Sequence, residues 1–79
     1  MDAHKAYLFD LGDDIKRRAF EVKAERDAAR PGTEKYSLHT GRLLAFNEVI
    51  SIMQQNASGL GISFEELRLQ DVDPDRDLV

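Results

Sequence analysis

Two long stretches of the chain repeat apolar residues every three or four positions, which is the spacing of one face of an α-helix. In the first stretch, the residues that share one stripe are Tyr7, Leu8, Leu11, Ile15, Ala19, Val22 and Ala29. Asp2 stands before the stripe as an N-cap, and the turn signal Pro31 and Gly32 follows it. We therefore expect a first helix over about residues 3–30, continuous through Gly12 although glycine costs roughly 1 kcal/mol inside a helix.

The second stretch predicts a helix that begins between Thr33 and Ser37 and ends at Ser58. Its apolar face consists of His39, Leu43, Phe46, Val49, Ile50, Met53, Ala57 and Leu60. Ala45 and Ile52 widen this face to about half of the helix circumference, which is more than one neighbouring helix covers.

A helix stop and a new helix start follow in close succession. We expect Gly59 or Gly61 to end the second helix with left-handed backbone, the conformation that glycine adopts most easily. Ser63 and Glu66 then form the pattern of a capping box, in which each residue bonds the backbone of the other. This pattern predicts a short third helix over about residues 64–70.

The remaining residues, 71–79, are acidic and rich in turn-forming residues. The sequence therefore divides into a single helical domain, residues 1–70, and an acidic C-terminal tail, residues 71–79. It leaves open whether Val72, Leu78 and Val79 pack on the helices. Because terminal segments are often poorly ordered, we expect deletion of the tail to leave helix content and assembly largely intact.

These elements predict an all-α fold, a long antiparallel helical hairpin with a short third helix. Two helices form a single layer that encloses no core of its own. Pairing two hairpins into a four-helix bundle would cover both apolar faces, and a two-fold homodimer is the commonest way to do so.

The distribution of charge supports this need for a partner. Residues 1–30 carry fourteen charged side chains, whereas the twenty positions from Leu43 to Ile62 carry one, Glu48. The chain has 79 residues and no cysteine, so neither disulfides nor thiolate metal sites can stabilise it. Its two histidines are too few for a zinc site. Oligomerisation remains among the devices that stabilise small chains.

Two aromatic residues of the first helix, Phe9 and Phe20, lie on its charged side, three turns apart. Such residues predict a contact surface for a second subunit or a partner protein. Alternatively, they lie under the third helix or against the stems of Lys and Arg side chains. The full set of predicted interface residues is Phe9, Phe20, Phe46, Val49, Ile50, Ile52 and Met53.

The segment over residues 57–63, ASGLGIS, followed by Leu67, resembles the turn of helix-turn-helix DNA-binding domains. In that family the second helix enters the major groove, and the resemblance implies this role for residues 64–70. However, Glu65 and Glu66 stand where cationic or amide side chains are expected, and the net charge of −4 resides entirely in residues 63–79. Because phosphates repel acidic groups, we expect no nucleic-acid partner and retain such a regulator only as an alternative.

No pattern in the chain is typical of an active site. His39 lies on an apolar face near Arg42, with Glu34 or Lys35 as further neighbours, and no serine or threonine stands in a nucleophile motif. We therefore expect no enzyme, no catalytic residue, no cofactor and no metal. A small-molecule binder or enzyme in the bundle core is a second alternative, and His39, Arg42 and Asn56 are its candidate polar groups.

Composition and pattern also limit the compartment. We find no signal-peptide pattern and no apolar run long enough for a membrane span. The polar face of the second helix, formed by Asn47, Ser51, Gln54 and Gln55, lacks the basic residues typical of membrane-surface helices. We expect a cytoplasmic, non-enzymatic protein-interaction module, acting as an adaptor, regulator or assembly subunit, with itself or another protein as partner and no membrane contact.

Overall fold

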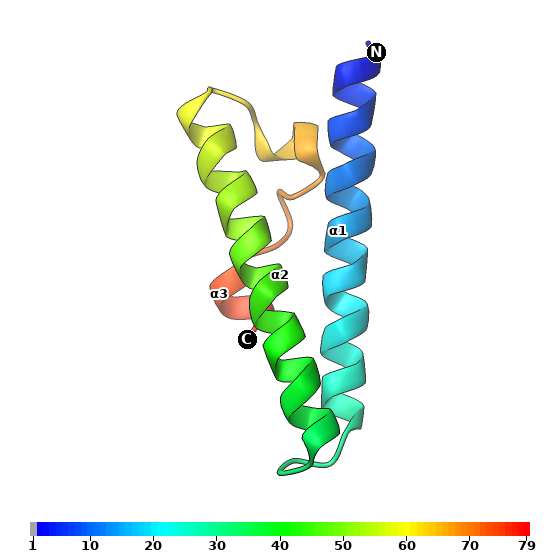
Figure 1. Ribbon diagram of the computed structural model, residues 1–79. Helices are drawn as coiled ribbons and strands as arrows, with labels where there is room; N and C mark the ends of the chain where they lie inside the picture. Colours follow the sequence, from blue (N-terminus) through cyan, green and yellow to red (C-terminus); the bar gives the residue numbers. More distant parts are fainter. Residues whose placement is uncertain (1) are drawn as a thin grey trace.

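The computed structural model describes residues 2–79 and is all-helical over this range (Figure 1). Its elements are α1 (Ala3–Ala28), α2 (Glu34–Gly59), the 3₁₀ helix η1 (Phe64–Leu67) and α3 (Pro74–Asp77). The two long helices lie side by side and antiparallel, which gives an elongated molecule of 45 × 21 × 16 Å. The predicted hairpin with a short third helix is confirmed, and the pairing of two hairpins into a four-helix bundle stays a prediction.

Helix α1 begins at the predicted cap, Asp2, and α2 begins at Glu34, within the predicted range, with Thr33 as its cap. The Asp2 carboxylate accepts a hydrogen bond of 2.9 Å from the Lys5 backbone N–H, and the Thr33 hydroxyl accepts one of 3.2 Å from that of Tyr36. Helix α1 ends at Ala28, two residues earlier than predicted. The residues before Pro31 are already extended there, as the steric demand of a proline ring favours.

The end of α2 is a Schellman motif, the closure that a left-handed glycine permits. The Ile62 backbone N–H donates to the carbonyl of Ala57 at 2.8 Å, and that of Gly61 donates to Ser58 at 3.3 Å. Gly61 has a φ of +69°, which confirms the prediction that one of the two glycines is left-handed. The helix extends to Gly59, one residue beyond the predicted end.

The third helix is shorter than predicted. The capping box is present: the Ser63 N–H donates to the Glu66 carboxylate at 2.9 Å, and the Glu66 N–H donates to the Ser63 hydroxyl at 3.4 Å. The helix ends after a single turn because Arg68 adopts a left-handed conformation, with a φ of 58°. This bend directs Leu69 into the core, where its exposed fraction is 0%.

The core combines both long helices with the C-terminal segment, residues 68–79. Its fully or nearly fully buried apolar residues are Ala19, Val22, Leu43, Ile50, Ala57, Leu67, Leu69, Val72 and Leu78. The sequence left open whether Val72, Leu78 and Val79 dock. Val72 and Leu78 are buried, whereas Val79 is 60% exposed. Burial of Val72 and Leu78 removes the physical basis for the expectation that deletion of residues 71–79 leaves helix content and assembly largely intact. We now expect this deletion to destabilise the fold.

Side-chain amides of α2 fix this segment in place. Asn47 Nδ2 donates to the Pro74 carbonyl at 2.7 Å, and Gln54 Nε2 donates to the carbonyls of Leu69 and Val72 at 3.1 and 2.9 Å. Asn47 had been predicted on the polar, solvent-facing side of α2, yet only 8% of it is exposed. The buried Asn47 amide is tolerated because it is hydrogen-bonded to the Pro74 carbonyl.

Basic residues of α1 hold the same segment from the other side. Lys16 Nζ lies 2.9 Å from the Asp71 carboxylate, and Lys23 Nζ donates to the Asp77 carbonyl at 2.6 Å. The hydrogen bond from Lys16 lowers the pKa of Asp71 below its usual value. The C-terminal segment thus lies against both long helices, and its connection to α3 passes behind α2 in Figure 1.

Candidate interaction surface

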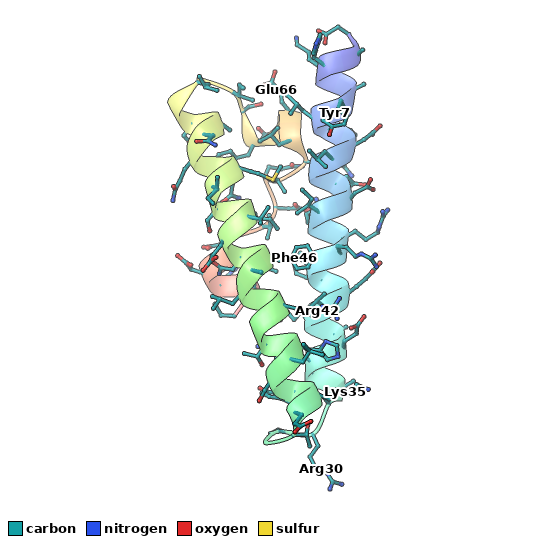
Figure 2. All side chains as sticks on the ribbon, in the orientation of Figure 1. Tyr7, Arg30, Lys35, Arg42, Phe46 and Glu66 are labelled. Carbon is teal, nitrogen blue, oxygen red and sulfur yellow. The ribbon has the colours of Figure 1, made fainter. Side chains whose placement is uncertain are left out.

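The two broad sides of the hairpin differ in what covers them. Residues 64–79 pack on one side, where they complete the core. On the opposite side, which we call the open face, the side chains at the junction of α1 and α2 are the outermost layer. Figure 2 shows Arg42 and Phe46 pointing from α2 toward α1 along this junction.

One stripe of α2 next to the open face is exposed along its whole length. We call it the α2 seam, and it consists of Leu38, Arg42, Ala45, Val49, Ile52, Asn56 and Leu60. Its residues follow one another at spacings of three and four, so they share one side of the helix. Leu38 is 62% exposed, Ile52 55% and Leu60 76%. Exposed apolar residues are ordinary when isolated, but a continuous stripe marks a contact surface.

The seam has a single charged residue, Arg42, and its charge is neutralised within the chain. Arg42 NH1 lies 3.1 Å from the carboxylate of Glu25 on α1 and 3.0 Å from Nδ1 of His39. The same Glu25 oxygen lies 3.5 Å from His39 Nδ1. The sequence placed Arg42 beside His39 correctly, but it could not reveal Glu25, because that contact depends on how α1 packs against α2.

The predicted interface residues are divided by the structure. Val49 and Ile52 lie exposed on the seam, 42% and 55%. Phe46 and Met53 are half-buried and pack against the core beside the seam. Ile50 is 0% exposed, so it belongs to the core of the chain and offers no surface to a partner. Leu38 and Leu60 lie exposed on the same seam but were not among the predicted interface residues, and their spacing of eleven residues from Val49 is the signal that could have grouped them with it.

The two aromatics of α1 differ from each other. Phe9 is half-buried, and the guanidinium carbon of Arg68 lies 5.0 Å from the centre of its ring. This cation–π contact matches the alternative in which the residue lies beside the third helix and a cationic stem. Phe20 is 40% exposed. It remains available to a partner, whereas Phe9 already has one within the chain.

Three hollows lie along α2. One, of about 240 Å³, is lined by Leu44, Leu78 and Val79 among others. An apolar hollow of about 280 Å³ opens at the Leu60 end of the seam, where Leu8, Met53, Leu60 and Ile62 line it. A polar hollow of about 430 Å³ lies beside the C-terminal segment, where Ser58, Gln55 and Asp75 are among its lining residues. The apolar hollow extends the open face beyond the seam itself.

The polar groups proposed for a site in a bundle core do not converge. His39 and Asn56 are both on α2, and seventeen residues at 1.5 Å per residue place them about 25 Å apart. His39 is buried beside Arg42 and Glu25, whereas Asn56 is exposed on the seam. Among residues 2–79, no three His, Cys, Asp or Glu side chains are grouped so that they could hold a metal ion.

The helical corner that resembles a helix-turn-helix also departs from that family. Residues 64–70 were expected to form its second helix, but only Phe64–Leu67 are helical and they make one 3₁₀ turn. Both Glu65 and Glu66 are exposed on this turn. No helix in the described part of the chain is long and apolar enough to cross a membrane.

Comparison with known proteins adds no relative. No protein-family model, no curated protein and no solved structure matches this chain. The α2 seam is therefore interpreted from its own geometry.

Proposed function

We propose that this chain is a small, non-enzymatic protein-interaction module that self-associates through the α2 seam, and serves as an adaptor, regulator or assembly subunit. The observation that supports the proposal is the α2 seam, seven exposed residues of which one is charged. Five of the seven residues are apolar, and monomeric proteins rarely expose large contiguous apolar patches. A cytoplasmic location and the lack of a nucleic-acid partner stay sequence-based predictions.

The energetics are compatible with a dimer of moderate affinity. Complete burial of a leucine, valine or isoleucine side chain contributes roughly 1.5–3 kcal/mol. Leu38, Val49, Ile52 and Leu60 supply four such side chains per subunit, each already partly covered. Association itself costs about 4–15 kcal/mol, so the surplus from eight partly covered side chains is modest. We expect dimers at micromolar concentration and dissociation on dilution.

Light scattering coupled to size-exclusion chromatography tests this proposal. At high micromolar loading, we expect a mass of twice the 9.0 kDa of one chain, falling toward 9.0 kDa as the sample is diluted. Far-ultraviolet circular dichroism on the same fractions checks that the helices are intact. A well-folded chain of 9.0 kDa at every concentration would refute self-association.

A further inference from the structure

We propose that the partner of the α2 seam is the same seam of a second copy, antiparallel to it, with a two-fold axis passing beside Val49. This inference rests on the proposed function and adds the surface, the orientation and the register. It also excludes the covered side of the hairpin as the contact surface.

The spacing of the seam favours a helix as its occupant. From Leu38 to Asn56 the seam residues alternate by four and three positions, which is the repeat that keeps one helix in contact with another along a shared axis. All of these positions are exposed in the single chain, although Leu38, Val49 and Ile52 are apolar. A partner helix would cover them together.

Four of the seven seam residues are placed symmetrically about Val49, whereas Ala45 stands four residues before it and Ile52 three residues after it. Leu38 and Leu60 stand eleven residues before and after it, and Arg42 and Asn56 stand seven residues before and after it. A two-fold axis beside Val49 brings the first half of one seam onto the second half of the other. Leucine then meets leucine at both ends, and the guanidinium of Arg42 approaches an amide that can accept its hydrogen bond.

Charge separates this arrangement from the parallel one. In a parallel pair, Arg42 would face Arg42 of the second copy, and like charges at an interface oppose association. In the antiparallel pair each Arg42 keeps its own Glu25, 3.1 Å away, and meets no second cation. The dipoles of the two helices also run in opposite directions, which favours the antiparallel pair.

Disulfide trapping tests the register, because the chain contains no cysteine and every introduced thiol is unique. A disulfide requires two Cα atoms within about 7 Å of each other. We expect Val49→Cys to form a covalent dimer on mild oxidation. We also expect Leu38→Cys mixed with Leu60→Cys to form a mixed dimer, and either variant alone to form little.

The control is Leu44→Cys, at a position of the same helix that is 56% exposed but lies off the seam. It should form no covalent dimer on oxidation, although it self-associates as the unmodified chain does. Circular dichroism verifies the fold of each variant, and a distance measurement between spin labels at the same cysteines gives a second readout without a covalent bond. Short label separation at position 49 and long separation at position 44 is the expected result.

The outcomes distinguish this inference from the proposed function. The register is wrong if the reduced protein dimerises but Leu38→Cys forms a disulfide with itself. It is also wrong if Leu44→Cys forms a disulfide as readily as Val49→Cys. Either result leaves self-association intact. Reduced protein that stays monomeric at all concentrations overturns both.

Discussion

At the scale of single residues, two side-chain amides hold the C-terminal segment in place. Asn47 and Gln54 lie on one side of α2 and donate three hydrogen bonds to carbonyls of the C-terminal segment. The carbonyls of Leu69 and Val72 belong to irregular backbone, whereas the Pro74 carbonyl lies in α3 and also accepts a hydrogen bond of 3.0 Å from the Leu78 backbone N–H. An unpaired buried carbonyl costs about 1–3 kcal/mol, so Gln54 stabilises the fold chiefly by preventing that cost.

Replacing Asn47 by alanine should lower the free energy of unfolding by about 0.5–1.5 kcal/mol, the usual net contribution of one hydrogen bond, because the Pro74 carbonyl loses one of its two donors and keeps the Leu78 N–H. Urea denaturation followed by circular dichroism measures the change. Gln55→Ala is the matched control, since Gln55 is exposed on the same helix. Equal stability of both variants would show that the hydrogen bond at 2.7 Å does not hold the segment.

Replacing Gly12 or Gly41 by alanine should change the melting temperature in opposite directions. A Cβ atom built on Gly12 would lie 1.8 Å from the Leu67 carbonyl oxygen, whereas one on Gly41 would have no atom within 4 Å. Alanine favours a helix interior over glycine by about 1 kcal/mol. Gly41→Ala should raise the melting temperature, and Gly12→Ala should lower it because η1 is forced away from α1. A rise for both would mean that η1 is not in contact at Gly12.

The sequence predicted these local features unequally. The caps at Asp2 and Ser63 and the left-handed glycine were predictable, because the residues that form them are neighbours in the chain. The burial of Asn47 was not, because periodicity assigns a polar residue to solvent unless the segment that covers it is known. Glu25 beside His39 was missed for the same reason.

At the scale of elements, the C-terminal segment is a structural part of the hairpin. Leu78 is 0% exposed and packs in the core with α1 and α2. Leu78→Ala should destabilise the fold by roughly 2–5 kcal/mol, the usual cost of a large-to-small change in a core. Val79→Ala is the control because Val79 is 60% exposed. Thermal melts that do not separate the two variants would show that the segment is not docked.

Docking of this segment should also depend on pH. A hydrogen bond from Lys16 lowers the pKa of Asp71, and hydrogen bonds from Arg76 and the Asp73 backbone N–H lower the pKa of Asp77. A carboxyl whose pKa is depressed on folding stabilises the fold above its unfolded pKa, about 4, and loses that contribution as the pH falls through the folded value. The Asp71 side chain is 63% exposed and the Asp77 side chain 22%, and both lie at the surface where solvent screens their ion pairs, so the effect is small.

We therefore expect melting temperatures that are level above about pH 5 and decline below about pH 4. Asp71→Asn should flatten part of this decline, because it removes the carboxyl that titrates against Lys16. Asp75→Asn removes the same charge from the same segment and should leave the slope unchanged. If both variants change the slope of melting temperature against pH equally, the pH dependence arises from net charge and not from the Asp71–Lys16 pair.

The long helices were predictable from the sequence to within about two residues at their ends, whereas the path of the C-terminal segment, residues 68–79, was not. A period of three to four residues persists over α1 and α2, and it identifies a helix without tertiary information. Leu69, Val72 and Leu78 share no such period, because Arg68 turns the chain left-handed and an irregular path follows. Their burial depends on the groove between the two helices.

At the scale of the whole molecule, the broad apolar arc of α2 serves two surfaces. One part, with Leu43 and Ile50, faces α1 and the core, and the other part is the exposed seam. The sequence predicted the width of the arc correctly, but it could not divide the arc between core and surface. For that reason Ile50 was assigned to an interface, and Leu60 was assigned to the buried face although it is 76% exposed.

The most direct test of self-association through the seam is sedimentation equilibrium on two charge variants of α2. Ile52 and Leu44 are 55% and 56% exposed, and of the two only Ile52 belongs to the seam. We predict that Ile52→Glu remains at 9.0 kDa at high micromolar concentration, whereas Leu44→Glu dimerises as the unmodified chain does. The assignment of the α2 seam as the interface would be contradicted if Ile52→Glu dimerised with unchanged affinity. It would also be contradicted if only Leu44→Glu lost dimerisation.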